Sequence, residues 1–349
     1  SGGGSSQVRS VGGAPVEIPL TSGAAASFAR MTWHASSPLN AIRAVTPDAT
    51  VTYVDGRDPA AAAAAARAAD IAVVFATQWT TEAQDVESLS LPDDQDGLIE
   101  AVAAANARTV VVLETGGPVL MPWLEKPPAV IQAWYPGQRG GEAIARILFG
   151  EVNPSGRLPI TFPASADQAP RPTVPGLAEM KAVDAAAASN PGAPQAAVLQ
   201  PFAVDYVEGS DVGYRWYERE GRKPLFPFGY GLSYTSFAYS NLAVSNTQGL
   251  SVAVDVTNSG DRAGAEVAQL YVASADQPRR LAAFARMTLS PGETRRIVLK
   301  AEPRILAEYD TALPGWRIAP GDYRITVARD AAEAGLSANV TLSGSIIKP

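Results

Sequence analysis

The chain has 349 residues, 46% of them hydrophobic and 18% charged, a mix that can bury a core and a length that favours two domains. Its net charge is −7 and it has no run of basic residues, so nucleic acid and membranes are not expected as partners. There is no cysteine, so disulfides, thiolate nucleophiles and cysteine-ligated zinc are excluded. The chain has a single histidine, His34. The absence of cysteine fits a periplasmic or secreted protein, which is the location we expect.

Helix and strand signals alternate in the first part of the chain. Residues 36–44 open with two serines and a proline, which are helix-capping and first-turn residues, and predict a short helix. Residues 51–54 predict a strand. Residues 60–69 are almost all alanine and predict a second helix.

Three short apolar runs, at residues 71–75, 110–113 and 129–133, predict strands that are buried on both faces of a parallel sheet. Further helices are expected after Pro92 and after Gly140. Strands and helices that alternate at this spacing predict a mostly parallel sheet flanked by helices, with right-handed crossovers. We place this α/β sandwich domain at residues 1–162.

The pattern changes after residue 162. Alanine, proline, glycine and serine dominate up to residue 200, so we expect a long surface excursion there, followed by an aromatic interdomain segment that ends at residue 235. Residues 236–349 show period-two alternation between turn signals, which predicts an antiparallel β-sandwich. The clearest strands are expected at residues 251–256, 267–272, 296–299 and 323–327.

Specific motifs occur in three stretches of the chain. They are Thr80-Thr81-Glu82-Ala83-Gln84-Asp85 with Leu91-Pro92, then Ala133-Trp134-Tyr135-Pro136-Gly137-Gln138 continuing to Asn153-Pro154-Ser155-Gly156-Arg157-Leu158-Pro159, and finally Phe226-Pro227-Phe228-Gly229-Tyr230-Gly231. In this order they resemble the C-terminal half of the family 3 glycoside hydrolases of the β-glucosidase type. The predicted β-sandwich resembles the fibronectin type III-like module of that family, and the resemblance covers nearly the whole chain.

The resemblance also implies what the chain lacks. The family's nucleophile is an Asp, usually before a Trp, on an N-terminal (β/α)8 barrel, and this sequence has no Asp-Trp pair. Residues 2–6 resemble the family's loop just after the first strand of its second domain. We therefore expect the barrel, the linker and that strand to be missing, as in a processed or truncated enzyme completed by an N-terminal barrel fragment.

Glu82 is the residue for which we expect an acid/base role. It follows a predicted buried strand, and open α/β sheets place functional groups at the carboxyl ends of their strands. Retaining glycoside hydrolysis needs a nucleophilic carboxylate and a second carboxyl group, about 5–5.5 Å away, that donates a proton. The resemblance implies that Glu82 is this donor. The alternative is a solvated acid on a flexible loop. Ala83 and Val86 stand where relatives have Gly and often Arg, which leaves Asp85 or Glu87 open as the acid.

Four further residues belong to the expected site. Trp79 precedes the loop and is expected to stack on a sugar ring at the leaving-group side, although packing at the strand end is equally open. Ser5 and Ser6 lie on a glycine-rich loop that borders the leaving-group subsite in relatives. They are candidates to bind a second sugar, although a plain loop is the simpler interpretation. Asp85 is expected to support the site.

The leading hypothesis is the acid/base-bearing part of a retaining, exo-acting β-glucosidase that hydrolyses terminal β-glucosyl residues of short oligosaccharides without metal or cofactor. Its expected partners are the barrel fragment and a small oligosaccharide, and a homo-oligomer is left open. A β-xylosidase or exo-glucanase of the same family is an alternative. So is a carbohydrate-binding or scaffolding module without activity, in which the aromatic residues at 214–217 and 226–230 bind polysaccharide.

Overall fold

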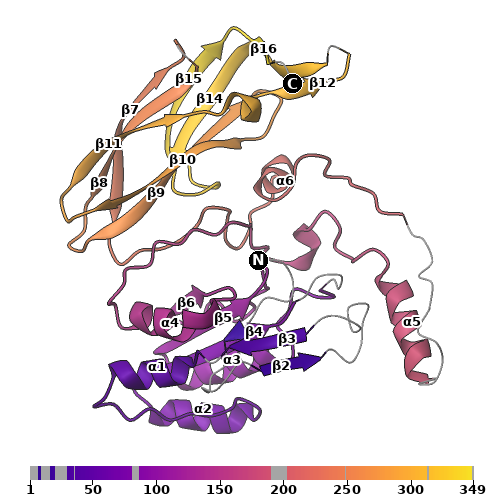
Figure 1. Cartoon of the computed structure of the whole chain (residues 1–349), viewed down its shortest axis with the longest axis vertical. Coiled ribbons are helices and arrows are strands. Elements are labelled where there is room, and N and C mark those ends of the chain that lie inside the picture. Colours follow the sequence, from indigo (N-terminus) through magenta and orange to yellow (C-terminus); the bar gives the residue numbers. More distant parts are fainter. Residues whose placement is uncertain are drawn as a thin grey trace. The chain divides into compact units, whose positions relative to one another are not determined.

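The structure is a computed structural model that describes residues 7–8, 16–19, 30–34, 36–80, 86–189, 203–247, 249–312 and 314–347 (Figure 1). The chain divides into two compact units, Ser1–Glu151 with Pro163–Val207 and Val152–Phe162 with Glu208–Pro349. Residues 152–162, which the sequence groups with the α/β region, thus belong to the same compact unit as the C-terminal strands.

The first unit is built on a parallel sheet of three strands, as the apolar runs predicted. The strands are β4 (Ala72–Gln78), β5 (Thr109–Thr115) and β6 (Ala129–Gln132), in the order β4-β5-β6. The middle strand β5 is the most buried, and Val111, Val112 and Leu113 are fully enclosed. A strand buried on both faces needs a continuous apolar run, which is why the sequence signal was clear.

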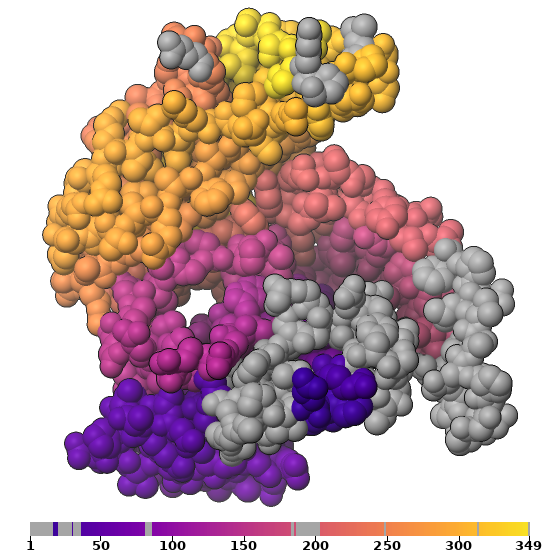
Figure 2. All heavy atoms as spheres, in the orientation of Figure 1, coloured from indigo at the N-terminus to yellow at the C-terminus, as the bar shows by residue number. Residues whose placement is uncertain are grey.

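Four helices accompany this sheet: α1 (Pro38–Val45), α2 (Pro59–Ala68), α3 (Gln95–Ala105) and α4 (Gly140–Leu148). Helix α2 packs against α3, and α1 packs against α4. The Ser37 hydroxyl accepts a hydrogen bond from the Asn40 backbone and caps α1, and Asp58 caps α2 in the same way. Helices α1 and α2 form part of the indigo and violet surface in Figure 2.

The glycine pair at the start of α4 serves close packing. A Cβ on Gly141 would lie 2.7 Å from the Ser37 carbonyl carbon, and the Gly141 backbone donates to the Ser36 hydroxyl at 2.9 Å. A side chain here would push α1 and α4 apart, because a contact under 3 Å with backbone cannot be relieved by a rotamer change.

One prediction for this unit is wrong, and one segment contains a helix that was not predicted. Residues 51–54 do not form a strand; they are mostly exposed, and β propensity without a partner strand does not make a sheet. The excursion expected between residues 163 and 200 contains helix α5 (Leu177–Ser189), whose alanine-rich sequence has the highest helix propensity.

A small second sheet was not anticipated. It has the order β1-β3-β2, with β1 (Gln7–Val8) parallel and β2 (Val16–Pro19) antiparallel to β3 (Arg30–His34).

The second unit is the predicted antiparallel sandwich, with three more strands than the sequence showed in its two main sheets. One sheet has the order β11-β8-β7 and the other the order β10-β9-β14-β15, with antiparallel pairing between neighbours. Their strands are β7 (Phe237–Ser245), β8 (Ser251–Asn258), β9 (Gly264–Ser274), β10 (Arg280–Leu289), β11 (Thr294–Lys300), β14 (Gly321–Ala328) and β15 (Leu336–Leu342). A third, short sheet has the order β12-β13-β16 and contains β12 (Glu308–Asp310), β13 (Gly315–Ile318) and β16 (Ser345–Ile347).

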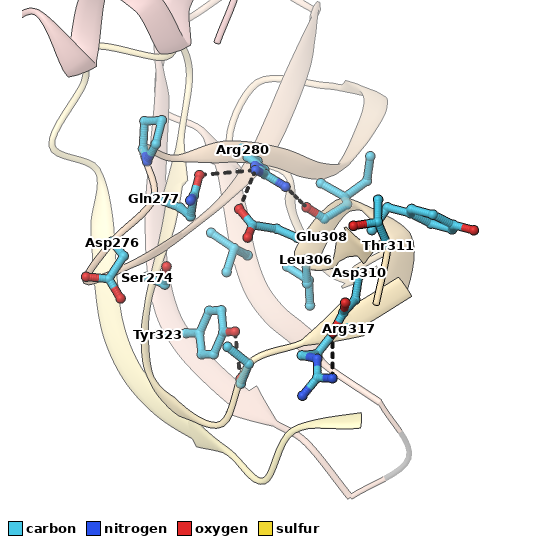
Figure 3. A pocket seen from close by; sticks show the side chains of 15 residues that line it. Ser274, Asp276, Gln277, Arg280, Leu306, Glu308, Asp310, Thr311, Arg317 and Tyr323 are labelled. Atoms are coloured by element: carbon cyan, nitrogen blue, oxygen red, sulfur yellow. Dashed lines mark hydrogen bonds and ion pairs between the residues drawn. The ribbon is translucent and has the colours of Figure 1, made fainter. Parts of the chain in front are cut away.

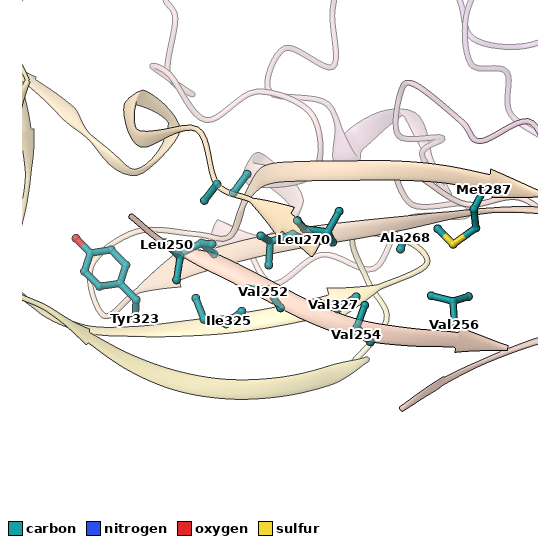
Figure 4. Packing of buried hydrophobic residues seen from close by; sticks show 14 of the residues in the cluster. Leu250, Val252, Val254, Val256, Ala268, Leu270, Met287, Tyr323, Ile325 and Val327 are labelled. Carbon is teal, nitrogen blue, oxygen red and sulfur yellow. The ribbon is translucent and has the colours of Figure 1, made fainter. Parts of the chain in front are cut away.

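The sandwich core follows the period-two alternation of its strands. Every second residue of β8 is buried, so Val252, Val254 and Val256 point inward toward residues such as Leu270 and Ile325 of the other sheet (Figure 4). Full burial of each such side chain stabilises the fold by about 1.5–3 kcal/mol.

Two of the motif segments, residues 152–162 and 225–230, also pack within this unit. Residues 152–162 run beside residues 225–230, and the backbones of Leu158 and Tyr230 and of Phe162 and Phe226 are hydrogen bonded. Helix α6 (Tyr214–Arg219) adds Tyr214, whose ring lies 5.0 Å from that of Phe228. The aromatic motifs therefore belong to one packed cluster.

Candidate active site at the carboxyl edge of the parallel sheet

Strand β4 ends at Gln78, and Trp79 and Thr80 lead from it into the loop that contains Glu82. The Tyr135 hydroxyl donates a hydrogen bond to the Gln78 carbonyl at 2.7 Å and lies 2.9 Å from the Thr80 hydroxyl. Tyr135 follows β6, so two strand ends that are far apart in sequence are joined at this edge. The start of the loop is thereby anchored to the sheet.

The backbone around Tyr135 and Thr80 is tightly constrained. Trp134 has a φ of +56°, a left-handed conformation that costs a non-glycine residue about 1–3 kcal/mol. A Cβ on Gly116 would lie 2.5 Å from the Thr80 hydroxyl oxygen and 2.9 Å from that of Tyr135. Only glycine at position 116 leaves room for the two hydroxyl groups to meet.

The chain is also fixed where it returns from the loop. The Leu89 carbonyl accepts a hydrogen bond from the Leu120 backbone at 2.8 Å, and Leu91 is buried. At the start of α3, the Gln95 side chain accepts from the Thr77 backbone N–H at 2.8 Å and donates to the Thr77 carbonyl at 2.9 Å. This amide therefore pairs with the edge of β4 as a neighbouring strand would. Both ends of the loop are held on the same sheet edge.

Glu114 is a buried carboxyl group at this edge. It lies opposite Thr77 in the register of β4 and β5 and is 2% exposed. Burial raises its pKa from 4.5 to about 8, because the charged form loses its hydration. Glu114 therefore holds its proton at neutral pH. Strongly perturbed carboxyl groups are enriched at functional sites, although burial alone also produces them.

Among the described residues, a buried polar atom without a hydrogen-bond partner lies at or next to the end of each of the three strands. They are the indole Nε1 of Trp79, Oε1 of Glu114 and Oε1 of Gln132, whose amide nitrogen donates to the Thr115 hydroxyl at 3.0 Å. Nearly all buried polar groups in proteins are satisfied, so unsatisfied groups call for an explanation such as a bound molecule or another part of the protein.

The structure describes one of the five site residues predicted from the sequence. Trp79 is half-buried at the end of β4. Glu82 and Asp85 lie outside the described residues, as do Ser5 and Ser6. Glu87, the alternative acid, is described, and its carboxylate pairs with Lys181 at 2.8 Å.

The roles of Glu114, Tyr135 and Gly116 were not predicted from the sequence. Glu114 had a usable signal, since it is the single acid at the end of an otherwise apolar strand. No group of three or more His, Cys, Asp or Glu side chains is placed to hold a metal ion within the described ranges. Among the helices of these ranges, none is long and apolar enough to cross a membrane.

Comparison with known proteins decides the family. A model described as the glycosyl hydrolase family 3 C-terminal domain matches residues 1–234, and a fibronectin type III-like domain model matches residues 266–331. The chain belongs to glycosyl hydrolase family 3. The parallel sheet with its helices and the β-sandwich that follows are those of the C-terminal part of this family, which confirms the predicted fold class.

The relatives are named β-glucosidases. A β-glucosidase of Rhizobium radiobacter is 43% identical over 289 residues, which cover 79% of this chain and 33% of the relative, and β-glucosidase B of Emericella nidulans is 42% identical over 81% of this chain and 34% of the relative. A solved β-glucosidase from Streptomyces venezuelae, in complex with D-glucose, is 41% identical with a TM-score of 0.69, over 81% of this chain and 35% of that one. The family 3 chain thus spans about a third of the length of the curated relatives it matches.

Proposed function

We propose that this chain carries the proton-donating half of a retaining β-glucosidase active site, with Glu82 as the acid/base residue. The observation that supports the proposal is that β4 ends at Gln78 and the described chain reaches Thr80 at the carboxyl edge of the sheet, two residues before Glu82 in the sequence. Active sites of open α/β sheets lie at such edges.

The anchored ends of the loop suit this role. A general acid acts only within hydrogen-bond reach of the oxygen that it protonates, about 2.6–3.2 Å. The contacts of Thr80 with Tyr135 and of Leu89 with Leu120 hold both ends of the loop on the sheet, which limits where Glu82 is presented. Trp79 at the same edge is half-buried and offers the exposed part of its flat apolar face to a sugar.

The chemistry divides between two carboxyl groups. In the first step Glu82 gives its proton to the glycosidic oxygen as the bond from that oxygen to the anomeric carbon breaks. A second carboxylate, supplied by the part of the enzyme that this chain does not span in its relatives, forms a covalent bond to the same carbon. In the second step Glu82 takes a proton from water, whose oxygen displaces the second carboxylate with overall retention.

The named activity of the relatives favours β-glucosides as substrates over the xylosides and longer glucans that the sequence left open. The glucose bound in the Streptomyces venezuelae enzyme also favours a glucosyl group at the cleaved end.

The test uses this chain assembled with the unmatched part of the Rhizobium radiobacter relative, with assembly checked by size-exclusion chromatography. Glu82→Gln should lower cellobiose turnover by about 10²–10⁴-fold, the usual contribution of general acid–base catalysis. The first step on a 2,4-dinitrophenyl glucoside should change far less, because that leaving group needs no proton.

Glu87→Gln is the matched control, since Glu87 is the acid of this loop region that the structure describes and its carboxylate is half-exposed. The proposal is wrong if the Glu82→Gln enzyme keeps its cellobiose activity, or if Glu87→Gln produces the substrate-dependent loss instead.

A further inference from the structure

The second unit contains two adjoining cavities that the proposed active site does not use. The first lies among β9, β10, β12, β13, β14 and the 3-10 turn η3 (Pro303–Leu306) (Figure 3) and has a volume of about 380 Å³. The second has a volume of about 660 Å³. Both are lined by Arg280, Ile305, Glu308 and Tyr309, so they border the same ion pair and the same aromatic ring. Their volumes fall within the range of small-molecule sites.

The two arginines of the first cavity are each paired with a carboxylate. Arg280 lies 3.6 Å from Glu308 and donates to the Gln277 side chain at 3.2 Å, and Arg317 donates to Asp310 at 2.7 Å (Figure 3). Each guanidinium already has a carboxylate, so neither offers an unneutralised charge to a phosphate or carboxylate ligand. Asp276 adds a further negative charge, which would repel an anion.

The cavity also presents hydrogen-bonding groups that are not in use. The hydroxyls of Ser274 and Thr311, the amide nitrogen of Gln277 and the carboxylate of Asp276 make no hydrogen bond with other described residues. Donors and acceptors occur side by side, which suits a ligand whose hydroxyl groups both donate and accept.

The aromatic ring of Tyr309 belongs to a residue that lines both cavities. Tyr309 is 48% exposed, and its ring meets the ring of Trp316 edge-on, with centroids 5.5 Å apart. The two residues are direct neighbours in the pairing of β12 with β13, so Trp316 supports Tyr309 from the adjacent strand. An exposed aromatic ring that is held in place offers a flat apolar surface.

From these groups we infer that the first cavity, together with the ring of Tyr309, forms a second sugar-binding site, which takes a short neutral oligosaccharide. One pyranose ring stacks its apolar face on Tyr309, and the hydroxyl groups of the sugar bind the free polar groups around Asp276, Gln277 and Thr311. This site goes beyond the proposed function, since it would hold a glucan chain on the sandwich without cleaving it.

Isothermal titration calorimetry of the 349-residue chain with cellotetraose tests the inference. We expect saturable binding that Tyr309→Ala weakens at least tenfold and that Tyr309→Phe, which keeps the ring, largely retains. The matched control is Phe284→Ala, which removes an aromatic side chain that is 66% exposed on β10 and lines neither cavity. Circular dichroism verifies that each variant is folded.

Glu82→Gln should leave cellotetraose binding unchanged, which separates this site from the proposed active site. The inference fails if cellotetraose shows no saturable binding up to millimolar concentrations, or if Tyr309→Ala binds as well as the unmodified chain. It also fails if inorganic phosphate displaces the sugar, because the cavity would then be an anion site.

Discussion

Glu266 in the second unit and Glu114 in the first unit are both buried carboxyl groups, but they differ in their hydrogen-bond and ion-pair partners. Glu266 on β9 is 1% exposed and accepts hydrogen bonds from one Arg157 nitrogen at 2.9 and 3.0 Å and from the Tyr239 hydroxyl at 3.1 Å. Glu114 on β5 is 2% exposed, has no ion-pair partner within the described ranges, and has its pKa raised by burial alone.

The difference separates a structural acid from a candidate functional one. The Arg157–Glu266 pair joins the 152–162 segment to the sandwich and satisfies its own charge. Glu114 keeps an oxygen without a partner among the described residues, near the end of β5 and opposite Thr77 of β4. Folded proteins leave few such atoms without a reason, and functional sites account for many of them.

Glu114→Gln should remove a dependence of stability on pH between pH 4.5 and 8. Between pH 4.5 and 8 the native carboxyl keeps its proton while an unfolded Glu releases it, so the native state binds more protons and stability falls as pH rises. The slope is about 1.4 kcal/mol per pH unit, or about 5 kcal/mol over the window. Denaturant melts at a series of pH values should show this slope in the unmodified chain and a flatter profile in the variant. Parallel profiles would mean that Glu114 ionises normally.

Arg157→Met should cost about 3–5 kcal/mol of unfolding free energy in the second unit, because it leaves Glu266 buried without its cation. The control is Arg146→Met, which breaks the exposed pair with Glu151 and should cost less than about 1 kcal/mol. Urea unfolding measures both. Equal costs would contradict the view that Glu266 depends on its partner.

Gly116→Ala should cost about 1–3 kcal/mol, since the new methyl group would press against the hydroxyls of Thr80 and Tyr135. Gly117→Ala is the control, because no atom lies within 4 Å of a Cβ built there. In the assembled enzyme only the first substitution should lower kcat for cellobiose. If both variants behave alike, the Thr80–Tyr135 contact does not position the loop.

The fold could be predicted from the sequence where the local pattern of apolar residues matches the burial of the element. The runs at 71–75, 110–113 and 129–133 became β4, β5 and β6, and the cap at Ser37 set the start of α1. The strand expected at 51–54 failed because propensity does not specify a partner strand. Strand β10 contains Arg280 and Arg286 and has a bulge near its start, so its sequence shows no clear alternation of apolar and polar residues.

Less of the site could be predicted. The motifs gave the loop of Glu82 and the neighbouring Trp79, but the contacts of Thr80 with Tyr135 and of Gln95 with Thr77 join distant segments. Such contacts depend on strand order, which no local pattern contains. The cavity around Tyr309 likewise requires β9, β10 and β12 to be placed together.

Azide rescue tests the central claim most directly. Glu82→Ala in the assembled enzyme, given a 2,4-dinitrophenyl β-glucoside, should accumulate the glucosyl intermediate and release β-glucosyl azide when azide replaces the activated water. NMR of the product identifies its anomeric configuration. Formation of the β-azide by Glu82→Ala but not by Glu87→Ala is the result expected, whereas absence of rescue, or full cellobiose hydrolysis by Glu82→Ala without azide, would contradict the assignment.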